Sequence, residues 1–174
     1  AFTDLGGNTN WFDEIERSAG LTQSHNVAFS SGNDHGNYRA SLGFVQRQGA
    51  LKNSDMKNYT VKLDATQYAF NKKLKLELGV LGSERDGKMQ YDPQKMFYSA
   101  AAYNPTYPTY KNVTTGEWDE DKLANEIYNP LGQLEVKDRF DVGSLNAHGK
   151  ATWTIADGLF LSAFGSYTLS LIHI

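Results

Sequence analysis

Three stretches of the chain alternate apolar and polar residues at every second position. Their apolar residues are Tyr38, Ala40, Leu42 and Phe44, then Tyr59, Val61, Leu63 and Ala65, then Leu74, Leu76, Leu78 and Val80. The positions between them include Arg39 and Ser41, Lys62 and Asp64, and Lys75 and Glu77. Because successive side chains of a strand point to opposite sides, each stretch predicts a strand with one apolar and one polar face. The pattern is typical of a membrane barrel and also of a half-solvated sheet in a soluble protein.

Turn signals between such stretches predict six strands. The ranges are 26–31, 37–48, 57–70, 74–84, much of 136–155, and a last strand from 159 to about 167. In the fifth strand the apolar residues change from even to odd positions, which predicts a bulge near Gly143 and Ser144. Short helices are expected from a cap at Asn10 to about Ser18, at 96–102 and at 121–127.

The connections between these strands are alternately short and long. The longest, about 85–135, holds all four prolines of the chain. Outer-membrane barrels place short turns on the periplasmic side and long loops outside. Six strands cannot close a barrel, since the smallest have about eight. The sequence therefore predicts an all-β antiparallel meander that forms part of a larger transmembrane barrel, with an extracellular loop at about 85–135.

Composition and motifs argue against several functions. The net charge of −3 comes without a basic stripe, so we expect no nucleic-acid partner. The chain has no cysteine, its four histidines are isolated, and the acidic residues at 117–121 lack the pattern of a calcium loop. No spacing indicates a nucleophile with its base. We therefore expect no catalytic residue, metal or cofactor, and a protein that is not an enzyme.

The long loop is the one segment with the composition of a binding surface. Its candidates for substrate or partner contact are Tyr98, Tyr103, Tyr107, Tyr110 and Trp118. Aromatic faces stack on sugars and peptides while their polar tips stay in water. The alternative is that these rings pack the loop against the barrel or a partner protein.

Several blocks of sequence resemble SusC/RagA-type TonB-dependent transporters, in the order and spacing of that family. They are NWFDEI (10–15), TQSHNV (22–27), YRASLGF (38–44), GALKNS (49–54) with Tyr59–Thr60, and the NP-containing pieces at 103–108 and 129–130. The resemblance implies a barrel of about twenty-two strands in the outer membrane of a Gram-negative bacterium. It also implies an N-terminal plug, energy supplied by the TonB complex through that plug region, and a SusD-like lipoprotein that delivers oligosaccharides or peptides.

On this interpretation residues 1–23 connect the plug to the barrel and residues 24–168 are the N-terminal part of the barrel. The plug and the TonB-contacting segment lie outside this sequence. Residues 169–174 are what a common sequencing-library adapter encodes, which indicates that they are not native. The alternative left open by the residues is a secreted, soluble β-sandwich that binds glycans.

Overall fold

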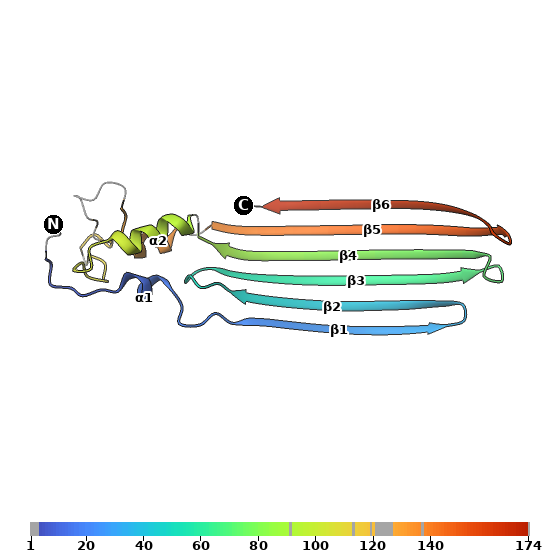
Figure 1. The fold of residues 1–174 in the computed structure, drawn as a ribbon, viewed down its shortest axis with the longest axis horizontal. Coiled ribbons are helices and arrows are strands. Elements are labelled where there is room, and N and C mark those ends of the chain that lie inside the picture. The colour runs from blue at the N-terminus through green and yellow to red at the C-terminus, as the bar shows by residue number, and fades with distance from the viewer. Residues whose placement is uncertain are drawn as a thin grey trace. The chain divides into compact units, whose positions relative to one another are not determined.

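The computed structural model describes residues 4–90, 92–112, 114–118, 120, 127–136 and 138–173. Its elements are α1 (Trp11–Ile15), β1 (Thr22–Asn33), β2 (Gly36–Gln48), β3 (Asp55–Ala69), β4 (Leu74–Met89), α2 (Pro93–Ala102), α3 (Pro130–Glu135), β5 (Asp138–Ala156) and β6 (Leu159–His173). The strands form one sheet in the order β1-β2-β3-β4-β5-β6 (Figure 1). The predicted antiparallel meander is therefore confirmed, and the described strands do not form the two sheets of a sandwich.

The short helices follow local signals in the sequence. Asn10 caps α1, its side chain accepting a hydrogen bond from the amide of Phe12, but the helix ends at Ile15 rather than near Ser18. The helix expected at 96–102 is confirmed and begins earlier, with Asp92 as its cap and Pro93 in the first turn. The helix expected at 121–127 falls mostly outside the described residues.

The bulge predicted near Gly143 is wrong for the pairing of β5 with β6. The register is continuous from Asp141 opposite His173 to Thr154 opposite Phe160, and the irregularity lies between Thr154 and Ala156, next to the turn. Without a shift, the apolar side chain of Val142 stays on the same side of β5 as that of Lys150. The apolar residues change from even to odd positions because Phe140 and Val142 lie on the polar side of β5, and the register itself is unchanged there.

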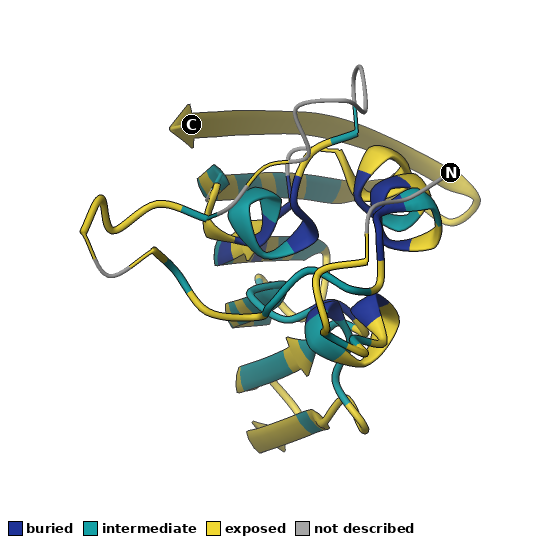
Figure 2. Ribbon diagram, turned by 90° about the vertical axis from the view of Figure 1, so that its left-hand side faces the viewer, coloured by how far each residue is buried: buried dark blue, intermediate teal, exposed yellow. Residues whose placement is uncertain are grey.

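The chain divides into two compact units. The first comprises residues 1–21, 47–55 and 88–139, and the second residues 22–46, 56–87 and 140–174. The first holds the hydrophobic core, whose buried residues are Trp11, Ile15, Leu51, Met96, Ala100, Tyr103 and Leu134. In the second unit the buried residues among those described are glycines, and the large apolar side chains are exposed or half-buried (Figure 2).

Within the described residues, no helix is both long and apolar enough to cross a lipid bilayer. Residues 169–173, whose adapter origin stays a prediction, continue β6 in register with residues 141–145 of β5.

Candidate functional site

Side-chain contacts between neighbouring strands place the apolar positions on one face of the sheet. The ring of Phe44 in β2 lies 6.3 Å from that of His25 in β1 and 5.2 Å from that of Tyr59 in β3. A side chain at Gly149 in β5 would contact Leu78 of β4 at 3.3 Å. Since strand side chains alternate, these contacts fix which residues of each strand share a side.

We call this side the apolar face. Its members include Val27, Phe29, Leu42, Phe44, Val61, Leu63, Leu76, Leu78, Leu145, Trp153, Leu161, Tyr167 and Leu171. The exposed fraction reaches 72% for Phe29, 60% for Leu42, 60% for Leu78 and 67% for Leu161. Leu42, Phe44, Val61, Leu63, Leu76 and Leu78, from three stretches that each predicted one apolar face, thus share one side of the sheet, and no other described part of the second unit covers it.

The opposite side, which we call the polar face, carries paired polar groups. Its ion pairs join Lys62 to Asp64 at 3.1 Å and Lys75 to Glu77 at 2.8 Å. Its hydrogen bonds join Ser83 to Ser144 and Asn146 to Thr168, both at 2.8 Å. These groups lie on residues of opposite parity to those of the apolar face, so the ion pairs and these hydrogen bonds lie together on the other side of the sheet, which in β5 and β6 also carries Val142, Phe160 and Phe164.

Gly79 of β4 supports the side chain of His148 on the polar face. A Cβ at Gly79 would lie 2.2 Å from Cε1 of the imidazole, so the exposed ring keeps this position only above a glycine. The imidazole also lies 6.4 Å from the ring of Phe164 in β6. A histidine that looked isolated in the sequence is therefore packed flat on the sheet, and among the described residues no group of three His, Asp or Glu side chains could hold a metal ion.

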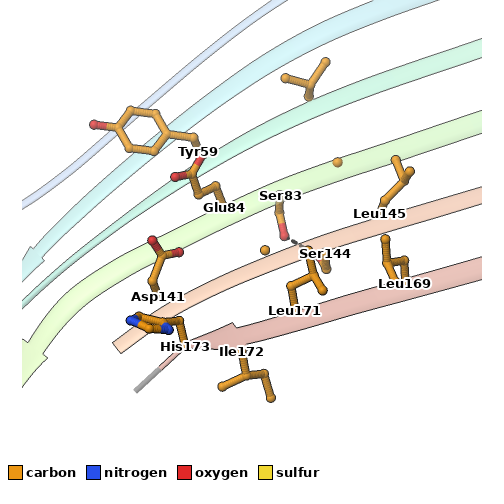
Figure 3. Close-up of a pocket in the computed structure, with 13 residues that line it drawn as sticks. Tyr59, Ser83, Glu84, Asp141, Ser144, Leu145, Leu169, Leu171, Ile172 and His173 are labelled. Carbon is orange, nitrogen blue, oxygen red and sulfur yellow. Dashed lines mark hydrogen bonds between the residues drawn. The ribbon is translucent and has the colours of Figure 1, made fainter. Parts of the chain in front are cut away.

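The apolar face changes character along the strands. A shallow hollow of about 630 Å³ is lined toward one end by Leu145, Leu169 and Leu171 and toward the other by Tyr59, Glu84 and Asp141 (Figure 3). A second hollow of about 240 Å³ is lined mainly by apolar residues of four strands, including Phe29, Tyr38, Leu63 and Leu78, and also by Arg39 and Asp64, which belong to the polar face by their parity. Charged side chains thus first appear on this face near the ends of β4 and β5 that adjoin the long connection.

Aromatic residues mark both limits of the apolar stretch. Phe44 and Tyr59 contact each other at the end near Glu84, and Phe70 and Trp153 lie 5.6 Å apart near the opposite turns. Such girdles flank the apolar band of outer-membrane barrels, which is about 25 Å tall. Eleven positions separate Tyr59 from Phe70, and a tilted spanning strand needs about 9 to 11 residues.

The long connection holds the aromatic residues singled out in the sequence, in different environments. Tyr103 is buried, packs edge-on against Trp11 at 5.0 Å and lies 5.2 Å from Tyr107. Tyr98 and Tyr110 are 63% and 68% exposed. Trp118 lies under the ammonium group of Lys111, 5.4 Å from Nζ to the ring centre. The structure thus brings Tyr103 and Tyr107 together as packing residues and leaves Tyr98 and Tyr110 open to contact.

Trp11 packs against the long connection, and the sequence analysis did not single it out. It is 2% exposed, and its Nε1 donates a hydrogen bond to the carbonyl of Asn104 at 3.1 Å. Nearby backbone bonds run from Gly7 to Thr106 at 2.9 Å and from Thr9 to Pro105 at 2.8 Å. The capped WFDEI helix could have indicated a buried tryptophan. Its hydrogen-bond partner Asn104 lies about ninety residues away, and no local sequence pattern predicts that contact.

Residues just before β1 are also held to the connection between β2 and β3. Arg17 binds both carboxylate oxygens of Asp55, at 3.0 and 3.1 Å, and reaches the carbonyls of Gly49 and Ser54 at 3.3 Å. Lys52 donates to the carbonyl of Glu14 at 2.7 Å, near the end of α1. The segment 5–17 is therefore pinned within the first unit by both long connections.

These features define a class of protein: a six-stranded antiparallel β-meander whose exposed apolar face carries an aromatic pair near each end, with a polar face behind it. No family model matches the chain. It is 30% identical over 155 residues to the TonB-dependent receptor SusC of Bacteroides thetaiotaomicron, a match that covers 77% of this chain and 15% of that receptor. It is 27% identical over 168 residues to the TonB-dependent receptor P3 of Formosa agariphila, covering 91% of this chain and 16% of the relative.

Both similarities support the TonB-dependent receptor family for this chain. Both relatives are named as receptors rather than enzymes, which agrees with the sequence-based expectation of a non-enzyme. The chain spans 15% and 16% of the lengths of these curated relatives, about a sixth of each.

Proposed function

We propose that this chain is part of the barrel wall of a SusC/RagA-type TonB-dependent receptor in the outer membrane of a Gram-negative bacterium. The observation that carries the proposal is the uncovered apolar face, bounded by aromatic residues and backed by a polar face on the same single sheet. The apolar face meets lipid and the polar face meets a wet lumen. The similarity to two named TonB-dependent receptors supports the same conclusion.

The whole protein imports oligosaccharides or peptides. Energy comes from the TonB complex through the plug region, and a SusD-like lipoprotein presents the substrate. Support for these partners comes from the sequence blocks at 10–15, 22–27 and 38–44 and from the name of one relative, the receptor SusC. Residues 24–168 supply wall strands and the loop at about 85–135, which lies outside the cell because short turns face the periplasm.

Within that loop, Tyr98 and Tyr110 are the rings that meet substrate or the lipoprotein. Their support is exposure, since more than half of each side chain is open. Tyr103 and Tyr107 stabilise the loop by packing: Tyr103 contacts Trp11, and the two tyrosine rings contact each other. Trp118, covered on one face by Lys111, contributes at the rim.

The test uses the full-length protein that contains this chain. Cells carrying the Tyr98→Ser/Tyr110→Ser double variant should keep normal amounts of heat-modifiable barrel in the outer membrane while nutrient uptake or capture of the lipoprotein decreases. Tyr128→Ser is the matched control, because Tyr128 is also exposed on the loop but lies under Lys95. Recovery of the wild-type protein from a compartment other than the outer membrane would contradict the proposal.

Deleting residues 90–130 is a coarser form of the same test. It removes Met96 and Tyr103 from the core around Trp11, so some loosening of the first unit is expected. Unchanged growth on the native nutrient, with the shortened barrel correctly inserted, would show that the loop only packs and that binding lies elsewhere.

A further inference from the structure

The strand β1 lies at one edge of the sheet but lacks the residues that usually protect an edge strand. β1 is twelve residues long and lies at one side of the sheet, paired only with β2 among the described strands (Figure 1). Natural edge strands are protected by charged residues, proline, bulges or short length. Thr22–Asn33 contains no Lys, Arg, Asp, Glu or Pro.

An unpaired edge is costly at membrane depth. About half of the residues of β1 direct their N–H and C=O groups away from β2, and each such group left unsatisfied in lipid costs several kcal/mol. Val27 and Phe29 of β1 are 71% and 72% exposed, as members of the apolar face are. The edge of β1 therefore needs a partner strand, which is either an upstream strand of this protein, the last strand of the barrel, or another copy.

The direction of β1 decides between these partners. β1 and β2 are joined by the two-residue turn Asp34–His35, and β3 and β4 by residues 70–73, whereas the connections after β2 and β4 are longer. If short turns face the periplasm, β1 runs from the outside inward. A barrel with an even number of strands has both chain ends on one side, and under the proposed function, with a plug that receives energy from the TonB complex, that side is the periplasm. Its first strand therefore runs outward, and β1 cannot be that strand.

The segment before β1 agrees with this direction. Residues 5–17 are fixed by hydrogen bonds to 104–107 and by the Arg17–Asp55 pair to 49–55, within the same unit as both long connections. Gly7 lies so close to the carbonyl of Thr106 that a Cβ would be 2.5 Å from its oxygen. The chain thus approaches β1 from the side of the long connections.

We propose that a strand of this protein upstream of residue 4 pairs antiparallel with the edge of β1, and that residues 4–21 are the end of the outer loop joining the two. This rests on the proposed function, and it replaces the plug-to-barrel connector expected for residues 1–23. The plug then lies at least one strand further upstream. The outer loops at 4–21, 49–54 and 90–137 share one hydrophobic core, which holds the loop arriving from the upstream strand to the loop that carries Tyr98 and Tyr110.

The first test is photo-crosslinking in the full-length protein, with a photoreactive phenylalanine analogue replacing Phe29. Leu63 is the matched control, because it lines the same hollow of the apolar face from the interior strand β3. Crosslinks from position 29 are expected to an upstream peptide and to β2, and those from position 63 only to residues of β2 and β4. Crosslinks from position 29 to the C-terminal strand of the barrel, to a second copy, or to β2 alone would overturn the inference.

The second test asks which side of the membrane the segment faces, using the absence of cysteine from this chain. In a cysteine-free full-length protein, Ser18→Cys should react with a membrane-impermeant maleimide on intact cells, and Asp34→Cys only after the outer membrane is opened. The reverse pattern in a correctly inserted barrel would overturn the inference and leave the barrel assignment standing. A protein absent from the outer membrane would overturn the proposed function, and this inference with it.

Discussion

Replacing Leu78 with arginine puts a charge at the centre of the apolar face. Leu78 lies four residues after the start of β4 and six before Glu84, which is about 13 Å and 20 Å along the strand. Its side chain is 60% exposed, so its removal loses little packing. The cost of Leu78→Arg therefore comes almost entirely from moving a guanidinium into lipid.

That cost is about 2 to 4 kcal/mol at the bilayer midplane. Since Arg can extend toward the interface, we expect about 2 kcal/mol, roughly a thirtyfold decrease in the ratio of folded to unfolded protein. The matched change on the polar face is Glu77→Arg, one residue away. It removes an ion pair with Lys75 in which both side chains are about a third exposed, so its cost should stay below about 1 kcal/mol. Glu77→Gln separates loss of the pair from the reversal of charge.

The assay is urea unfolding of the full-length barrel in lipid vesicles, read from the heat-dependent mobility of the folded form. Leu78→Arg should unfold at lower urea concentration than wild type, and both Glu77 variants should remain close to wild type. Equal loss in Leu78→Arg and Glu77→Arg would refute the assignment of the two faces, because a soluble or inverted sheet would not tell them apart in this way.

Three further predictions concern the packing described above. Gly79→Ala should cost the barrel less than about 1 kcal/mol, because the exposed imidazole of His148 can move away from the new methyl, and that cost should be absent when His148→Ala is added. Trp11→Phe removes the buried indole hydrogen bond at a cost of about 1 to 2 kcal/mol, and should speed protease cleavage within 90–112 while barrel insertion is unchanged. Arg17→Lys loses the two-pronged contact with Asp55, and because that pair is partly exposed the loss should be below about 1 kcal/mol, seen as faster cleavage at 49–54.

Local sequence chemistry predicted the sheet well. The period-two pattern at 74–80 is a direct consequence of side chains that must meet two different solvents, so β4 and its two faces could be read from the residues. The same reasoning failed near Gly143, because an apolar residue such as Val142 can occupy the polar face without any change of register. A break in the alternation shows only that apolar residues have moved to the other face. A bulge is one possible cause, and a change of residue type at unchanged register is another.

The core of the first unit could not be predicted in the same way. α1 spans five residues and α3 six, too few for a helical period to emerge. The contact of Trp11 with Tyr103 joins segments about ninety residues apart, and no local propensity encodes such a pairing. For the same reason the sequence could nominate aromatic rings of the loop but could not separate the buried Tyr103 from the exposed Tyr98 and Tyr110.

The central claim, that one face of this sheet meets lipid and the other water, is tested most directly by spin labels at adjacent positions of β3. Leu63→Cys and Asp64→Cys in the full-length protein, each labelled with a nitroxide in lipid vesicles, compare the two faces at the same depth. The label at 63 should be relaxed mainly by oxygen dissolved in the bilayer, and the label at 64 mainly by a water-soluble nickel chelate. Equal access of the two reagents at both positions, or the opposite preference, would contradict the account.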